Sequence, residues 1–162
     1  MPTRIVKSKR WWACDEKMKG LIIELMLIAI GAVAGAFLRY RITSSPLLIL
    51  DILSINVLIV NVIGSFILGV FSVLAVAWNL DSKYSLLVAV GFCGSLTTMS
   101  SFALETARFI DERFFGKMTV NLVVNIGFSI GAIIAGRQLV NAIMIFEVEA
   151  VCYDKEDNEN IC

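Results

Sequence analysis

The sequence predicts an all-α membrane protein with four transmembrane helices, the third broken at its centre. The 162 residues are 58% hydrophobic and 17% charged, whereas soluble domains carry about 25% charged residues. Four apolar segments also approach the roughly 20 residues that an α-helix needs to cross about 30 Å of hydrocarbon. They run over residues 21–38, 53–78, 84–104 and 118–136. Because the bilayer core offers backbone groups no hydrogen-bond partners, these segments must form helices.

Polar ends flank the apolar segments and divide the chain into three parts. Residues 1–20 form a basic N-terminal arm with six of the 14 Lys and Arg, and we expect it to be disordered or to lie on the membrane surface. Residues 21–137 form a four-helix transmembrane domain, and residues 138–162 form an acidic C-terminal tail that we expect to be frayed. The first segment ends in "FLRYRI" instead of a small-residue cleavage site, so it is a retained helix and not a signal peptide.

Charge and residue usage argue against several classes of function. The formal net charge is zero, so we expect no nucleic-acid partner. The chain has no His, and its four Cys show no C-x-x-C spacing. This removes the usual zinc sites and nucleophile–base pairs, and we therefore expect no enzyme. We expect Cys93 to pack as a small apolar residue.

Basic residues near the helix ends are almost balanced between the two sides of the membrane. On the side of the termini these are Lys17, Lys19, Lys83 and Arg137. On the other side they are Arg39, Arg41, Arg108, Arg113 and Lys117. So small a bias favours insertion in both orientations, which would allow an antiparallel dimer with dual topology.

Two pairs of glycines, in "GAVAG" (residues 31–35) and "GFSIG" (residues 127–131), have the small-xxx-small spacing that lets helix backbones approach closely. They serve either association between copies or packing within one protomer.

Polar side chains recur on one face of the second and fourth segments. Asn61 and Ser65 lie four residues apart, as do Asn121, Asn125 and Ser129 in succession. Asn61 either makes an interhelical hydrogen bond, worth about 1 kcal/mol, or points an amide N–H at a passing anion. Three polar residues in register over two turns predict a track along a water-accessible path.

Carboxylates are confined to the ends of the segments, where Glu24 and Glu105 lie. Proton-coupled carriers place an ionisable group in the membrane interior. The composition of the segments therefore favours passive conduction over proton antiport. Neutral hydrogen-bond donors suit a permeating anion better than a fixed positive charge, because the ion must also leave.

The third segment contains "GFCGSLTTMSSFALE" (residues 91–105), which concentrates glycine, serine and threonine at membrane depth. Glycine adds backbone freedom, and Ser and Thr hydroxyls compete for backbone carbonyls, so we predict a break in the helix here. Freed carbonyls can hold a cation, and a half-helix N-terminus can face an anion. The alternative is a continuous helix that uses small residues for tight packing.

Three motifs resemble those of the Fluc (CrcB) family of fluoride channels. They are "GAFLRY" (residues 35–40), "VNVIGSFILG" (residues 60–69) and "GFCGSLTTMSSF" (residues 91–102), and the resemblance covers roughly residues 21–137. It implies a multi-pass protein of the cell membrane that forms a dual-topology antiparallel dimer. The dimer would contain two fluoride pathways and a structural Na⁺ at its centre.

The resemblance also assigns functions to individual residues. The backbone carbonyls of Gly94 and Thr97 would hold the sodium ion, and Arg39 would have a structural or vestibule position. The fluoride pathway would comprise Asn61, Met99, Ser101, Phe102, Asn121, Asn125 and Ser129. A phenylalanine suits this pathway because its ring edge is electropositive and can contact a small anion.

The third motif departs from the family pattern at three positions. Ser95 replaces a glycine, Ser101 replaces a threonine but keeps the hydroxyl, and Met99 replaces a phenylalanine. A thioether has no electropositive ring edge. Met99 is therefore a tolerated polarizable filler, a cause of slower conduction, or a sign that a paralogous partner subunit supplies part of the pore.

The sequence therefore predicts a fluoride-selective, proton-uncoupled channel that exports fluoride and lowers its cytoplasmic level. One alternative is a non-conducting partner subunit of a heterodimeric fluoride channel. Another is a small dual-topology multidrug transporter, which needs a membrane-embedded glutamate in the first helix. Glu24 lies too close to the helix end to fit that second alternative well.

Overall fold

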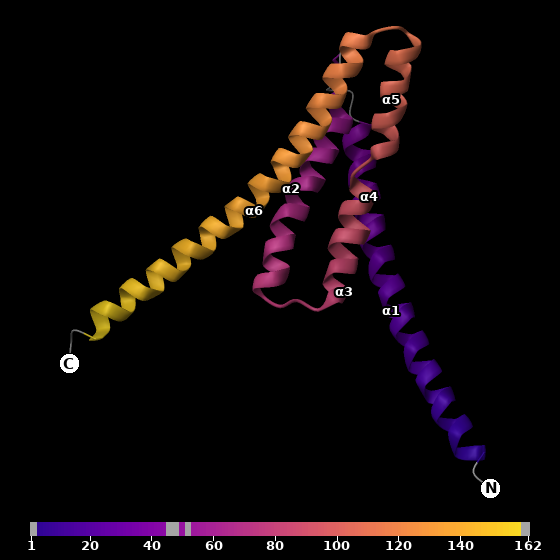
Figure 1. Ribbon diagram of the computed structural model, residues 1–162, viewed down its shortest axis with the longest axis vertical. Helices are drawn as coiled ribbons and strands as arrows, with labels where there is room; N and C mark the ends of the chain where they lie inside the picture. Colours follow the sequence, from indigo (N-terminus) through magenta and orange to yellow (C-terminus); the bar gives the residue numbers. More distant parts are fainter. Residues whose placement is uncertain (1–2, 45–48, 51–52, 160–162) are drawn as a thin grey trace.

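The computed structural model describes residues 3–44, 49–50 and 53–159. The chain crosses the molecule four times, and both termini lie at the same end (Figure 1). The elements follow one another as α1 (Thr3–Thr43), β1 (Ile49–Leu50), β2 (Leu53–Ser54), α2 (Ile55–Ala77), α3 (Ser82–Ser85), the π-helix η2 (Leu86–Cys93), α4 (Gly94–Leu96), α5 (Met99–Asp111) and α6 (Phe115–Glu159).

The prediction of four membrane-length helices is confirmed. Within the described residues, helical stretches that are long and apolar enough to span a bilayer are Glu16–Thr43, Ile55–Ala77, Ser82–Asp111 and Phe115–Phe146. The protein is therefore a multi-pass membrane protein. The second span begins at Ile55 and not at residue 53, because β2 pairs with β1 in a short antiparallel ribbon that the sequence did not predict.

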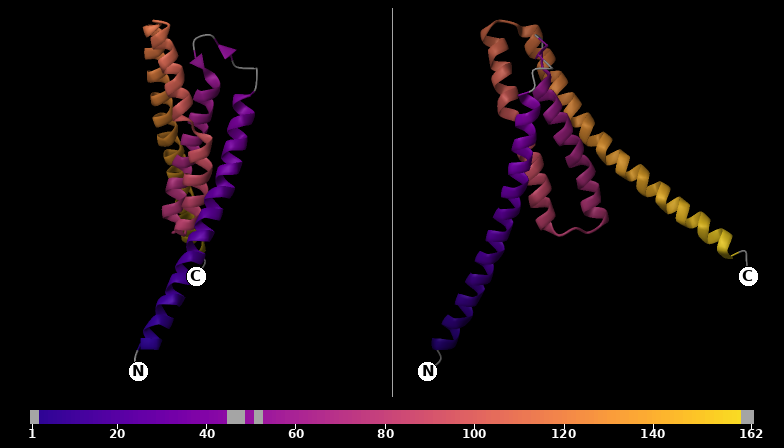
Figure 2. Two further views of the ribbon diagram at one scale, coloured as in Figure 1. Left: turned by 90° about the vertical axis from the view of Figure 1, so that its right-hand side faces the viewer. Right: turned by 180° about the vertical axis from the view of Figure 1, so that it is seen from behind.

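Both flanking regions continue the helices next to them. α1 begins at Thr3 and α6 ends at Glu159, where the sequence led us to expect a disordered or surface-lying arm and a frayed tail. Figure 2 shows the two extensions diverging beyond the α2–α3 hairpin. The physical reason is local, because residues 3–19 and 138–159 contain neither proline nor glycine, the residues that most weaken a helix.

α1 packs against η2 with the two backbones in close contact. Gly31 and Gly35 of α1 are buried, and a Cβ on either would collide with carbonyl oxygens of the third span. A Cβ on Gly91 of η2 would lie 2.7 Å from the Ile28 carbonyl oxygen. The "GAVAG" glycines therefore serve packing within the protomer.

α2 and α6 form the second close helix pair, where a Cβ on Gly136 would lie 2.6 Å from the Phe66 carbonyl oxygen. The "GFSIG" glycines are placed differently. In the part of the chain that the structure describes, nothing beyond their own helix backbone lies within 4 Å of a Cβ added at Gly127 or Gly131, and both glycines line an apolar groove of about 740 Å³ between α2 and α6. The two glycine pairs thus have the same spacing but different surroundings.

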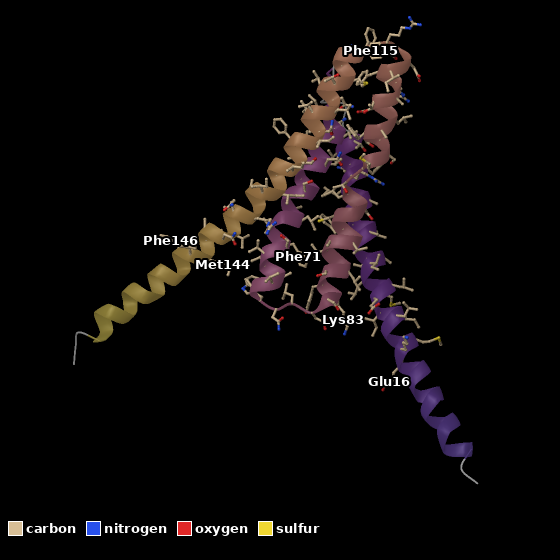
Figure 3. All side chains as sticks on the ribbon, in the orientation of Figure 1. Glu16, Phe71, Lys83, Phe115, Met144 and Phe146 are labelled. Carbon is tan, nitrogen blue, oxygen red and sulfur yellow. The ribbon has the colours of Figure 1, made fainter. Side chains whose placement is uncertain are left out.

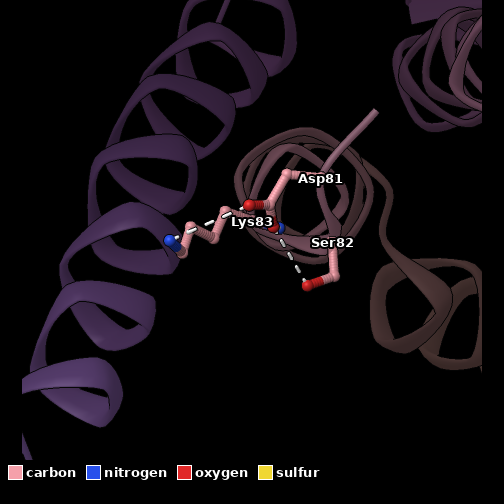
Figure 4. Close-up of polar contacts among 3 residues, drawn as sticks. All are labelled: Asp81, Ser82 and Lys83. Carbon is pink, nitrogen blue, oxygen red and sulfur yellow. Dashed lines mark hydrogen bonds and ion pairs between the residues drawn. The ribbon is translucent and has the colours of Figure 1, made fainter. Parts of the chain in front are cut away.

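A tight turn joins α2 to the third span, with Asn79 at φ 47°. Asp81 caps α3, since its Oδ1 accepts the Lys83 backbone N–H at 3.0 Å (Figure 4). That bond, with smaller contributions from the Lys83 ammonium and the Ser82 hydroxyl, holds the pKa of Asp81 below its usual value. Figure 3 shows Lys83 at this end of the bundle and Phe115 at the other, where the α5–α6 turn lies.

Candidate ion pathway

The third span is broken at two consecutive threonines. Thr97 (φ −72°, ψ 152°) and Thr98 (φ −141°, ψ 98°) are extended, between α4 and α5. Thr98 also caps α5, because its Oγ1 accepts the Ser101 backbone N–H at 3.3 Å. The predicted break is present and includes Thr97, but neither Gly91 nor Gly94 adopts an extended conformation. Gly91 lies within η2 and Gly94 keeps a helical φ of −62°, so the break lies three residues beyond Gly94.

Asn61 of α2 holds the break open. Its Oδ1 accepts the Thr98 backbone N–H at 2.8 Å. In a continuous helix that N–H would donate to the Gly94 carbonyl, so the side chain of Asn61 replaces a backbone acceptor and releases the carbonyl. Because a backbone N–H can only donate, the bond also fixes the Asn61 amide with its two N–H groups directed elsewhere.

A cavity of about 410 Å³ adjoins the break, between α2, the third span and α6. No Asp, Glu, Lys or Arg is among the described residues that line it. Phe102 is buried at its wall, whereas Met99 is 72% exposed in the protomer. The cavity brings together seven of the ten residues to which the family resemblance assigned a function, namely Asn61, Gly94, Thr97, Met99, Phe102, Asn125 and Ser129.

Three predicted residues do not line this cavity. Ser101 is half-buried, and its Oγ accepts the Thr98 hydroxyl at 2.9 Å, so it stabilises the break. Asn121 is fully buried behind Asn125. Arg39 is half-buried near the end of α1, where its carbonyl accepts the Thr43 hydroxyl at 2.9 Å.

The asparagines of α6 form a chain of hydrogen bonds with α5. Asn125 Nδ2 donates to Asn121 Oδ1 at 2.7 Å, and Asn121 Nδ2 donates to Thr106 Oγ1 at 3.2 Å. The Thr106 hydroxyl donates to the Phe102 carbonyl at 2.9 Å. The interval of four residues predicted that the two asparagines share a face. It did not indicate that they would bond to each other instead of both facing an ion.

Sequence analysis did not assign Ser65, Cys93, Thr98 or Thr106 to the site. Ser65 and Cys93 line the cavity, and Cys93 is buried as expected of a small apolar residue. Thr98 could have been found as a helix N-cap, since threonine is a favoured residue there. Thr106 carries no comparable signal, because its contact with Asn121 depends on the packing of α5 against α6.

The fold and the cavity define a four-span membrane protein with an uncharged polar site beside a broken helix. Residues 26–137 match the family model described as "CrcB-like protein, Camphor Resistance (CrcB)". The chain belongs to the CrcB family.

Relatives from several organisms carry the name "Fluoride-specific ion channel FluC". The protein from Nitrosopumilus maritimus is 58% identical over 127 residues, which is 78% of this chain and 98% of the relative. The protein from Methanocaldococcus jannaschii is 37% identical over 76% of this chain and 98% of its own. The protein from Shewanella pealeana is 35% identical over 72% of this chain and 95% of its own.

Proposed function

We propose that this chain is a fluoride-selective, proton-uncoupled channel that lets fluoride leave the cell across the cell membrane and so lowers its cytoplasmic level. The names of its relatives support fluoride as the ion. The observation that carries the proposal is the cavity beside the break, which offers neutral hydrogen-bond donors and no charged side chain among the described residues. Such donors bind an anion without trapping it.

The chemistry of the cavity suits a small, strongly hydrated anion. The Asn61 oxygen is committed to Thr98, so its amide N–H groups remain for the ion. Hydroxyls of Ser65 and Ser129 add further donors. The buried ring of Phe102 adds an electropositive edge, which contacts an anion weakly. Together these groups replace part of the hydration shell while each contact stays weak enough for exit.

We further propose that two copies assemble as a dual-topology antiparallel homodimer with a structural Na⁺ at its centre. The residues at the break fit a sodium ion, because hard cations bind oxygen ligands. The Gly94 carbonyl has lost its helical donor to Asn61, and Thr97 has left the helical conformation. In the dimer, these carbonyls would hold the ion and fix the break.

A partner subunit of a heterodimeric channel is the second candidate, because Met99 stands exposed where the family pattern has an aromatic ring. The multidrug transporter is less well supported. Glu24, the carboxylate it would need, lies on α1 and does not line the cavity.

Fluoride efflux from proteoliposomes that contain only this chain tests the proposal. We expect rapid efflux that does not require a pH gradient, with little chloride efflux. Efflux no faster than from empty vesicles, or equal chloride efflux, would refute it. If this chain conducts only after a paralogous subunit is added, the heterodimer is correct. If transport requires both Glu24 and a pH gradient, the multidrug transporter gains support.

A further inference from the structure

The hydrogen-bond chain of α6 leads from the cavity to Thr106, which does not itself line the cavity. Asn125 is 4% exposed and lines the cavity, and Asn121 behind it is fully buried. From Asn125 to Asn121, and from Asn121 to Thr106, each amide N–H donates to the next residue. The Thr106 hydroxyl ends the chain at the Phe102 carbonyl. All of these hydrogen bonds therefore have the same direction, with donors that lead from Asn125 toward Phe102.

With the hydrogen bonds in this direction, the unpartnered polar atom of Asn125 is its oxygen, which is unsuitable for binding an anion. Its Oδ1 is buried and has no hydrogen-bond partner among the residues that the structure describes. An amide oxygen repels fluoride, whereas an amide N–H binds it. Asn61 differs in this respect, because the Thr98 backbone N–H holds its oxygen and fixes its orientation. Among the described residues, no backbone N–H holds the Asn125 oxygen in the same way.

The hydrogen bonds from Asn125 through Asn121 to Thr106 can all reverse their donor–acceptor direction with little movement of heavy atoms. A half-turn of an amide exchanges its oxygen and nitrogen at nearly equivalent positions. After both amides turn, Thr106 donates to Asn121, Asn121 donates to Asn125, and the Asn125 amide N–H groups take the unpartnered position that its oxygen held at the cavity wall. Thr106 permits both directions because a hydroxyl has one donor and two acceptor lone pairs. The Phe102 carbonyl can lose that hydroxyl because a helical carbonyl also accepts a backbone N–H.

The two directions have different energies. Asn125 Nδ2 also donates to the Asn121 main-chain carbonyl at 3.1 Å. Reversal would replace that bond by two oxygens facing each other, so the observed direction is favoured without an anion. An anion beside Asn125 accepts the N–H that reversal exposes, and a hydrogen bond to a charged acceptor is stronger than one to a neutral carbonyl.

We propose that Thr106 is a positioning residue, whose hydroxyl lets the Asn121–Asn125 pair reverse so that Asn125 turns an N–H toward fluoride. The inference rests on the proposed function, since it assumes that fluoride enters the cavity. In this proposal Asn121 does not contact the ion; its amide turns together with that of Asn125 and so links Asn125 to Thr106.

Fluoride efflux through two substitutions of Thr106 provides the first test. Thr106→Val keeps the shape of the side chain and removes the hydroxyl, and Thr106→Ser restores it. Thr119→Val is the matched control, because Thr119 makes the same hydroxyl bond to the carbonyl four residues earlier, at 3.0 Å to Phe115, on an exposed part of α6. We expect Thr106→Val to reduce efflux roughly tenfold, as expected for the loss of one buried hydrogen bond, and the other two to stay within about twofold of wild type.

Side-chain amide resonances of ¹⁵N-labelled protein in nanodiscs provide the second test. The Asn125 signals are assigned from their disappearance in Asn125→Ala. We expect potassium fluoride, and not potassium chloride, to shift them in the wild type and in Thr106→Ser, but not in Thr106→Val. If Thr106→Val does not fold, Thr106→Ala is measured in its place.

The inference is overturned if removal of the hydroxyl leaves efflux unchanged. It is also overturned if efflux falls while the Asn125 signals still shift with fluoride, because Thr106 would then act through stability alone. A wild-type chain without efflux would refute the proposed function. A hydroxyl-dependent shift of the Asn125 signals in that same chain would still support the reversal.

Discussion

The two halves of the third span are held in place by different interactions. The first half, η2 and α4, lies backbone to backbone against α1, and the closest approach is that of Gly31 to the Leu87 carbonyl. The second half, α5, is fixed largely by polar side chains, through the Asn61–Thr98 bond at the break and the Asn121–Thr106 bond to α6. We therefore expect added volume to be costly where the first half faces α1, and the hydrogen bonds of the second half to be easier to change.

The largest expected effect is that of Gly91→Val in the first half. A Cβ there would lie 2.7 Å from the Ile28 carbonyl oxygen and 3.0 Å from the Gly31 Cα. Backbone atoms cannot yield easily, so we expect destabilisation by about 3 kcal/mol and loss of monodisperse protein. Gly127→Val is the matched control, because among the described residues nothing beyond its own helix backbone lies within 4 Å of a Cβ added there. Equal thermal midpoints for the two variants would contradict the comparison.

Asn61→Asp addresses the junction of the two halves. The carboxylate keeps an acceptor for the Thr98 N–H, so we expect the fold to persist. A negative charge a few ångströms from the ion should lower fluoride efflux by about a hundredfold or more. Asn141→Asp on an exposed face of α6 is the control. Wild-type efflux from Asn61→Asp would remove Asn61 from the pathway.

Phe102→Ala should have a smaller effect in the second half. The substitution removes a ring that is 4% exposed and lines the cavity. We expect efflux to fall roughly tenfold, because the ring edge no longer contacts the anion. Phe128→Ala, at a side chain that is 61% exposed, is the control and should conduct as the wild type does. If neither Phe102→Ala nor Asn61→Asp changes efflux, the proposed pathway is wrong.

Met99→Phe should have the smallest effect. Met99 is 72% exposed in the protomer, so a ring can be placed there without displacing packed neighbours. Because the ring supplies an electropositive edge, we expect efflux to be kept or raised by about twofold to threefold. Leu104→Phe, at an exposed position of the same helix, controls for an added ring. A large loss in Met99→Phe alone would show that the thioether itself is required.

The sequence predicted the four spans well because bilayer thickness dictates both their length and their apolar composition. It also placed the break within the correct segment. It did not single out Thr98, since the hydrogen bond that holds Thr98 in the break comes from Asn61, which lies 37 residues earlier in the chain. The sequence analysis likewise did not predict the π-helix or the β1–β2 ribbon, because neither has a distinctive local sequence pattern.

The residues of the candidate site show the same division. Their spacing on each helix predicted which polar side chains share a face, and the cavity contains most of them. The helical period could not decide which of them would face the cavity and which would bond to each other. Asn125 lines the cavity, whereas Asn121 is enclosed between Asn125 and Thr106.

The sequence by itself determined the class of protein, the number of spans and the segment that breaks, because these follow from hydrophobicity and backbone preferences that act within one helix. Only the tertiary structure decided how identical patterns are used. Gly31 and Gly35 pack against η2, while Gly127 and Gly131, with the same spacing, face open space. Contact between helices depends on which neighbour each face meets, and that information lies in the arrangement of all four spans and not in any one of them.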